Sequence, residues 1–197
     1  MPVSSMTADG STLLLPTRLA PPPAYYSMMV RHGGPVAICR GERFDKRCKD
    51  AHRFTIADTR GPLELTVPVS KPYGRTWATT SVSLHGRWWE VMWAALESAY
   101  GRTPFFEFYA DDFKPLLSDP DRFASVADLN EGFDRAIRRA IGLTKEITYV
   151  DAGRPAEIAP FDPEPYWQLR RDTLGFIPGL SILDMVFNLG PETLLRL

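Results

Sequence analysis

The chain has little cysteine and histidine. Its 197 residues include two cysteines, Cys39 and Cys48, and three histidines, with no Cys-x-x-Cys pair. A structural zinc site needs four such ligands at short spacings, and the sequence does not supply them. The two cysteines either form one disulfide or stay as free thiols in a reducing compartment. We favour free thiols, because a chain of this length can bury a core without cross-links.

Long apolar runs are also missing. No stretch reaches the roughly 18 apolar residues of a membrane-spanning helix, and the first residues lack the basic and apolar regions of a signal peptide. We therefore expect a cytoplasmic protein without a membrane span. Residues 1–11 are small and polar and predict a flexible leader, so that residues 12–197 form a single domain. The net charge of −1 gives no reason to expect nucleic acid as a partner.

Several well-marked catalytic motifs are absent. The sequence has no glycine-rich phosphate loop of the Walker or dinucleotide type, no serine nucleophile elbow and no visible cysteine–histidine pairing. These absences exclude whole enzyme classes without selecting one. The sequence indicates neither a cofactor, which stays unknown, nor a set of metal ligands.

Strand and helix patterns interleave along the chain. Short apolar or alternating runs predict strands, and residues at helical spacing predict helices. The fold class that follows is α/β: a single domain with a mixed, mainly parallel sheet and a hairpin, flanked by helices. The strands are expected at residues 12–15, 36–39, 54–57, 63–69, 81–84 and 145–150, and the helices at 24–33, 87–100, 126–143 and 181–190.

The helix expected over residues 87–100 carries three of the five tryptophans. Trp89, Met92, Trp93, Leu96 and Tyr100 fall on one apolar stripe, which is first of all a stripe that faces the core. Burial stabilises each such ring by roughly 2–3 kcal/mol, so no ligand is needed to explain them. Trp88 lies off this stripe and is therefore the candidate for stacking on a ligand.

A basic segment covers residues 40–53, where six basic and three acidic residues leave a charge of +3. Arginine fits carboxylates and phosphates in a bidentate way, so such a segment can clamp an anion. The named candidates for binding a substrate are Lys46, Arg47, His52 and Arg53. The alternative, equally weighted, is a solvated segment whose charges pair with one another.

Two further groups are candidates for catalysis. His85 precedes Gly86 at the expected start of a helix, where backbone N–H groups can hold an anion, and Arg87 follows it. Asp111 and Asp112 close an aromatic run and could act as acid or base. The simpler readings are a turn histidine with a capping role, and solvated carboxylates that open a helix at Lys114.

Four segments of the chain resemble the WbqC-like protein family, in particular its forms from Bacteroidetes. They are LLLPTRLAPPPAYYSMM, FDKRCKDAHRFTIADTRGPLELTVPVSKP, WWEVMWAALESAYGRTPFFEFYADDF and GFIPGLSILDMVFNLGPE. The resemblance implies a bacterial protein linked to O-antigen and other surface-polysaccharide biosynthesis. It carries over no catalytic residue. The chain departs from the family pattern at Leu15-Pro16 and at Ala24, where other members often have Gln-Pro and Gly.

Two hypotheses remain open at this point. The first is a cytoplasmic, transferase-like enzyme that acts on a nucleotide-linked sugar or a similar anionic metabolite. In it the basic segment grips the anion, and His85, Arg87 and Asp111 or Asp112 lie opposite. The second is a non-catalytic binding or scaffolding protein that meets a partner through the basic segment 40–53. The sequence gives no oligomeric state.

Overall fold

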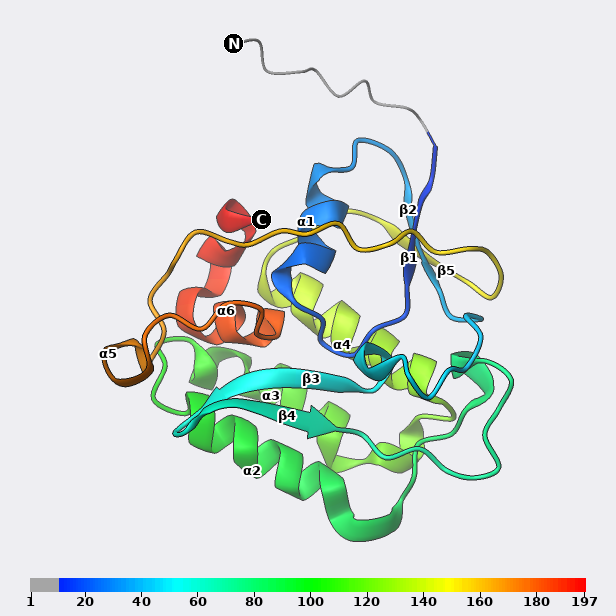
Figure 1. The fold of residues 1–197 in the computed structure, drawn as a ribbon, viewed down its shortest axis with the longest axis horizontal. Coiled ribbons are helices and arrows are strands. Elements are labelled where there is room, and N and C mark those ends of the chain that lie inside the picture. Colours follow the sequence, from blue (N-terminus) through cyan, green and yellow to red (C-terminus); the bar gives the residue numbers. More distant parts are fainter. Residues whose placement is uncertain (1–10) are drawn as a thin grey trace.

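The computed structural model describes residues 11–197, so residues 1–10 of the expected leader lie outside the described part. Two small sheets and a set of helices form one mixed α/β domain (Figure 1). The expected fold class is confirmed, with the parallel strands and the hairpin in separate sheets. The strands are β1 (Leu13–Pro16), β2 (Val36–Cys39), β3 (Arg53–Asp58), β4 (Gly61–Thr66) and β5 (Ile147–Val150). The helices are α1 (Pro23–Arg31), α2 (Trp88–Tyr100), α3 (Phe106–Ser118), α4 (Val126–Ala140), α5 (Arg171–Leu174) and α6 (Ile182–Leu189).

The parallel sheet has the order β1-β2-β5, with β2 in the centre. All four residues of β2 are buried, as expected for a strand with neighbours on both sides. Tyr26 of α1 donates to Asp134 of α4 (3.4 Å), which ties these two helices together beside the sheet. The segment that follows β5 crosses β1 (Figure 1). There the Ala156 amide donates to the Leu14 carbonyl at 2.8 Å, a usual length for such a bond.

The hairpin β3–β4 forms the second sheet and packs against α2 in the lower half of Figure 1. The expected two strands are confirmed, and Gly61 occupies a positive φ of 120° at the turn, which favours glycine. The strand expected at 81–84 is wrong: a single bridge between Val69 and Val82 takes its place. A short alternating run without a continuous partner cannot form a ladder.

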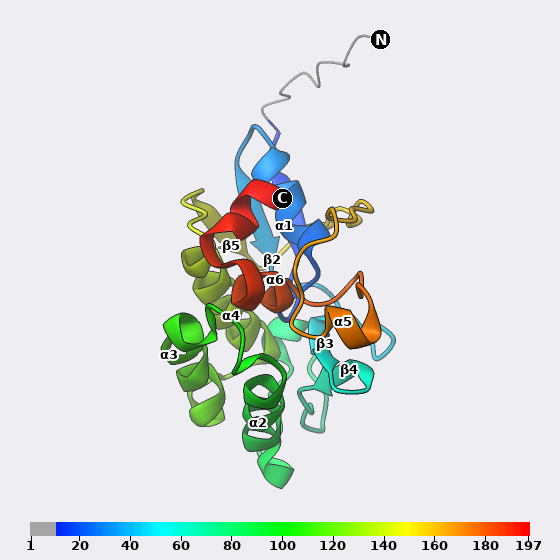
Figure 2. The same ribbon diagram turned by 90° about the vertical axis from the view of Figure 1, so that its left-hand side faces the viewer.

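The helix α6 lies inside the helical half of the molecule and contacts α2, α3, α4 and β3 (Figure 2 shows it between α1 and the hairpin side). Its eight residues are all buried. Ser181 caps it by accepting from the Leu183 amide (3.2 Å), as expected. Asp184 does not complete a capping box, because its side chain points to a different pair of partners.

That pair is Tyr166 and Gln168. The Tyr166 hydroxyl donates to Asp184 Oδ2 (2.6 Å), and Gln168 Nε2 donates to the same oxygen (2.9 Å). Gln168 also binds the Ile177 amide and carbonyl at 2.9 and 3.0 Å. Burial raises the pKa of Asp184, against the hydrogen bonds that lower it. We call Tyr166, Gln168 and Asp184 the Asp184 cluster; it fastens the chain before α6 to the core.

Two helical expectations need correction. α3 begins at Phe106 rather than Lys114, so Asp111 and Asp112 lie inside a helix instead of opening one. Its buried residues Phe106, Phe113 and Leu117 recur at helical spacing, and the helix continues through Pro115. On α2, the face in contact with the core contains Trp88, Met92, Leu96 and Tyr100, whereas Trp89 and Trp93 are only partly buried.

In the described part of the chain, no helix is long and apolar enough to cross a membrane.

Candidate functional site

The parallel strands end at one edge of the sheet, where the chain turns into loops. Thr17 and Arg18 follow β1, Arg40 follows β2 and Asp151 follows β5. In open α/β sheets, ligands bind beyond the carboxyl ends of the strands. The loops after β2 and β5 approach each other so closely that a Cβ on Gly41 would lie 1.6 Å from the Asp151 carbonyl oxygen. Only glycine fits there.

Asn130 of α4 lies against this edge and is 2% exposed. Its amide nitrogen donates to the Thr17 hydroxyl (3.1 Å) and to the Ala51 carbonyl (2.9 Å). The carbonyl of Ala51 can only accept, so the orientation of the Asn130 amide is fixed. Its Oδ1 is buried and has no hydrogen-bond partner among the described residues. Such an orphan acceptor is uncommon in native proteins and needs a physical reason.

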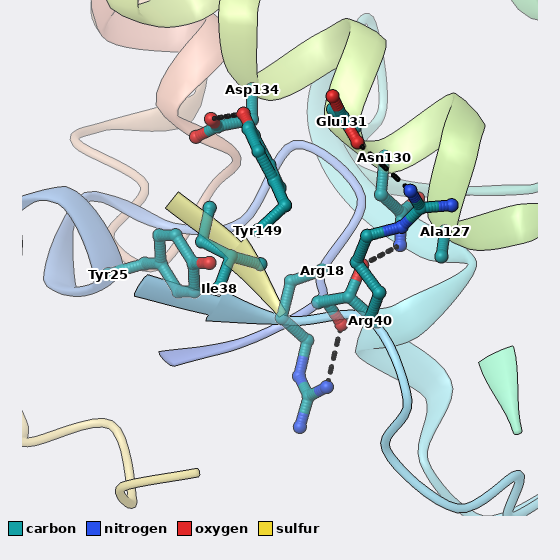
Figure 3. Close-up of a pocket in the computed structure, with 10 residues that line it drawn as sticks. Arg18, Tyr25, Ile38, Arg40, Ala127, Asn130, Glu131, Asp134 and Tyr149 are labelled. Atoms are coloured by element: carbon teal, nitrogen blue, oxygen red, sulfur yellow. Dashed lines mark hydrogen bonds and ion pairs between the residues drawn. The ribbon is translucent and has the colours of Figure 1, made fainter. Parts of the chain in front are cut away.

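Arg40 reaches along α4 and forms ion pairs with Asp128 and with Glu131 (3.6 Å for the latter). Its Nε is a second buried group without a partner in the described part of the chain. Figure 3 shows Arg40 directed toward Glu131, whereas the Arg18 guanidinium points away from α4. We call Thr17, Arg18, Arg40 and Asn130 the sheet-edge cluster.

Arg18 is held by Glu42, with 2.7 Å from Nη1 to Oε2, and it also donates to the Thr17 carbonyl (2.7 Å). Burial by itself would lower the pKa of Arg18, but the Glu42 carboxylate more than compensates and the pKa is raised. Arg18 is therefore a fixed positive charge beside the sheet edge.

Beneath the sheet-edge cluster lies a closed polar group centred on Asp134. Asp134 Oδ2 accepts from Tyr149 (2.7 Å) and from Arg138 (2.8 Å). Burial raises the pKa of Asp134 and also that of Tyr149. These hydrogen bonds hold α4 against β5.

The cluster lines a crevice of about 10 Å³, bordered also by Tyr25, Ile38, Ala127, Glu131, Asp134 and Tyr149 (Figure 3). A volume of about 10–15 Å³ is the minimum for one water molecule. A larger ligand therefore enters only when a border side chain moves. Arg40 is the side chain most able to do so, since it is long and a quarter of its side chain is exposed.

The structure separates the residues of the basic segment. Arg47 pairs with Asp45 (3.0 Å) in solvent, and Lys46 lies 4.8 Å from the centre of the Tyr73 ring. His52 is buried: its Nδ1 bonds to the Val67 carbonyl (2.9 Å), its ring stacks on Trp77, and burial lowers its pKa. Arg53 pairs with Glu64 (2.8 Å) across the hairpin and borders a separate cavity.

The start of α2 does not join the basic segment. His85 is exposed, and Arg87 pairs with Glu90 in solvent. Trp88 is 8% exposed and its Nε1 donates to the Ser83 carbonyl (2.6 Å). The expectation that Trp88 lies off the buried stripe was wrong, because Trp88 stands four residues before Met92 on the same buried face and its ring packs into the core.

Asp111 and Asp112 lie in the middle of α3. Asp112 pairs with Arg139 of α4 (2.9 Å), and Asp111 is exposed. Among the described residues, no hydrogen bond or ion pair links either aspartate to His85, to the basic segment or to the sheet edge. The predicted catalytic and binding residues are thus dispersed over several elements.

Sequence reasoning missed Arg18, Asn130 and Asp134, and it included Arg40 in the basic segment 40–53 without naming it as a candidate. One signal was present: Asn130 and Asp134 stand four residues apart within the apolar face of the helix that carries Leu129, Phe133 and Ile137. Polar side chains on a buried face require partners, and those partners come from distant parts of the chain.

Comparison with known protein families gives a match. The model of the WbqC-like protein family matches residues 44–155, which is more than half of the chain and includes the hairpin, α2, α3, α4 and β5. No curated protein and no solved structure matches.

Proposed function

The chain belongs to the WbqC-like protein family, and from that premise we propose that it is a transferase-like enzyme acting on a nucleotide-linked sugar or a similar anionic metabolite. The substrate binds at the sheet-edge cluster. The pathway we propose is surface-polysaccharide biosynthesis in the cytoplasm. The free thiols of Cys39 and Cys48 fit the reducing conditions of that compartment.

The observation that carries this proposal is the pair of orphan groups, Asn130 Oδ1 and Arg40 Nε, beside one crevice. Each buried group without a partner costs about 1–3 kcal/mol. A ligand that offers a hydroxyl donor to Asn130 and a phosphate oxygen to Arg40 would remove both costs. A sugar diphosphate has both kinds of group, and arginine is well suited to phosphate.

The catalytic roles of His85, Asp111 and Asp112 stay predictions, as do the substrate contacts of Lys46, Arg47, His52, Arg53, Arg87 and Trp88. The dispersal of these residues favours the sheet edge as the first place to test. For a transferase, the group that activates the acceptor would come from the same edge, where Glu42, Asp128 and Glu131 are the carboxylates paired with the arginines.

The experiment is a calorimetric titration with a nucleoside diphosphate sugar, the nucleoside diphosphate alone and the neutral sugar. Arg40→Gln is compared with Arg139→Gln, which changes an exposed arginine of α4 that pairs with Asp112. We expect Arg40→Gln to weaken binding of the charged ligands at least about tenfold, or about 1.4 kcal/mol, and Arg139→Gln to leave it unchanged. Saturable binding of no charged ligand, or equal affinity in the Arg40→Gln protein, overturns the proposal.

A second function has its own supporting observation. Arg43, Lys46 and Lys49 of the basic segment are exposed, and none of them forms an ion pair within the described residues. An acidic surface on a partner protein would suit them. Lys46→Glu combined with Lys49→Glu would then abolish a salt-sensitive complex in pull-down experiments while metabolite binding persists. Loss of metabolite binding in this variant would instead support a single anion site that extends to the basic segment.

A further inference from the structure

A cavity of about 130 Å³ lies farther along the loop that carries Arg18. It is bordered by the end of the β1–α1 loop, by the hairpin and by the turn before α6: Ala20, Pro21, Pro22, Asp50, Arg53, Phe54, Thr55, Glu64, Gly179 and Ser181. An engineered protein cavity of about 150 Å³ accepts benzene, so this one has room for a ligand of a few heavy atoms. Its lining combines three charged side chains with apolar ones.

We call this the Arg53 cavity. Its walls are fixed by hydrogen bonds between distant segments. The Ser181 hydroxyl donates to the Ala20 carbonyl (2.7 Å), the Ser181 amide to the Thr55 carbonyl (2.8 Å) and the Ile182 amide to the Pro21 carbonyl (2.9 Å). Ala20 has a φ of +40°, a strained conformation for a residue with a side chain. The cavity is therefore preorganised, which lowers the cost of binding.

The charges in the cavity are unequal. Arg53 Nη1 donates to Glu64 (2.8 Å), while Arg53 Nε is buried without a partner among the described residues. Asp50 also lines the cavity, so the lining contains two carboxylates and one guanidinium. A simple anion would meet two like charges, and a simple amine would leave the unpartnered donor of Arg53 unsatisfied.

We propose that the Arg53 cavity binds a small zwitterion, namely an α-amino acid with a short side chain. The ligand carboxylate bonds to the guanidinium of Arg53, and its ammonium group lies between the carboxylates of Asp50 and Glu64. Phe54 and Pro21 contact the side chain of the ligand and limit its size. The site is separate from the sheet-edge cluster, so this inference does not depend on the proposed transferase activity.

The Arg53 cavity and the sheet-edge crevice share one loop. The β1–α1 loop contributes Thr17 and Arg18 to the sheet-edge crevice and Ala20 to Pro22 to the Arg53 cavity. A ligand in one site therefore contacts the same loop as a ligand in the other. An amino acid in the cavity would be a second substrate or an effector of that loop.

The test is a titration of the full chain, without any nucleotide, by calorimetry or by ligand-observed NMR. The probes are glycine, L-alanine and L-serine, with acetate and methylamine as the two halves of the zwitterion and L-tryptophan as an oversized amino acid. We expect saturable binding of the three small amino acids in the range of Kd ~1 mM or tighter, and at least about tenfold weaker binding of acetate, methylamine and tryptophan. Equal binding of either half, or no saturation by any small amino acid, overturns the proposal.

Variants locate the site. Arg53→Gln should weaken binding of glycine and alanine at least about tenfold, whereas Arg139→Gln should not change it. Thermal unfolding of both variants shows whether each is folded, and Asp50→Asn provides a second test because its exposed side chain carries little of the fold. Binding that survives both Arg53→Gln and Asp50→Asn excludes this cavity as the site. Since nucleotide sugars are absent from this titration, its failure and that of the proposed function are distinguishable.

Discussion

The Asp184 cluster and the sheet-edge cluster both place polar side chains against buried helices, but their hydrogen bonding differs. In the first, Asp184 Oδ2 accepts from both Tyr166 and Gln168, and Gln168 is also bonded through its Oε1. In the second, Asn130 Oδ1 and Arg40 Nε remain without partners among the described residues. Satisfied buried groups stabilise a fold, whereas unsatisfied ones beside a crevice point to a ligand.

The largest expected effect on stability comes from a substitution in the Asp184 cluster. Asp184→Leu removes the acceptor of Tyr166 and Gln168 and leaves two buried donors unpaired, each at about 1–3 kcal/mol. We expect the free energy of unfolding to fall by about 2–5 kcal/mol in urea denaturation. Asp184→Asn keeps an oxygen acceptor and resembles the neutral form that burial favours, so it should cost clearly less. Equal losses in the two variants would contradict a role for these hydrogen bonds.

In the sheet-edge cluster, a substitution should affect ligand affinity more than stability. Asn130→Leu loses the bonds to Thr17 and Ala51 but also removes the orphan Oδ1, so we expect a smaller loss of stability, about 1–2 kcal/mol. Affinity for the nucleoside diphosphate sugar should fall at least about tenfold. Measurement of both quantities decides the comparison. A large loss of stability with unchanged affinity would place Asn130 among the purely structural groups.

The smallest expected effect on stability concerns His52. It was predicted to bind a ligand, but the structure shows it buried and hydrogen-bonded to the Val67 carbonyl. Because burial lowers its pKa in the folded protein, the unfolded chain takes up a proton first as the pH falls below about 6.5. The contribution of neutral His52 to stability is therefore complete above that pH and decreases as the pH falls toward the lowered folded value. His52→Gln should flatten this part of a curve of unfolding free energy against pH. An unchanged slope would show that His52 stays accessible to protons in the folded state.

Much of the fold was predictable, because periodicity is local. The alternation in the hairpin, the helical spacing of α2 and α4 and the serine cap of α6 are all legible in short windows of sequence. The errors came where a local signal misled. Asp111 and Asp112 suggested a helix that begins at Lys114, whereas α3 begins at Phe106, and Trp88 stood outside a stripe defined by its neighbours.

The candidate sites were less predictable. Charge density drew the first interpretation to Lys46, Arg47 and Arg53, yet the latter two pair with nearby carboxylates. The sheet-edge cluster depends on a contact between Asn130 and Thr17, 113 residues apart, which no short window contains.

The sequence by itself determined the α/β class, the hairpin and the family, because these follow from residue spacing and from segments of contiguous residues. Only the tertiary structure decided which polar groups are paired, which remain open, and that the β1–α1 loop, the hairpin and the turn before α6 surround one cavity. The physical reason is that hydrogen bonding and burial depend on neighbours in space, and chain folding brings those neighbours together from distant positions.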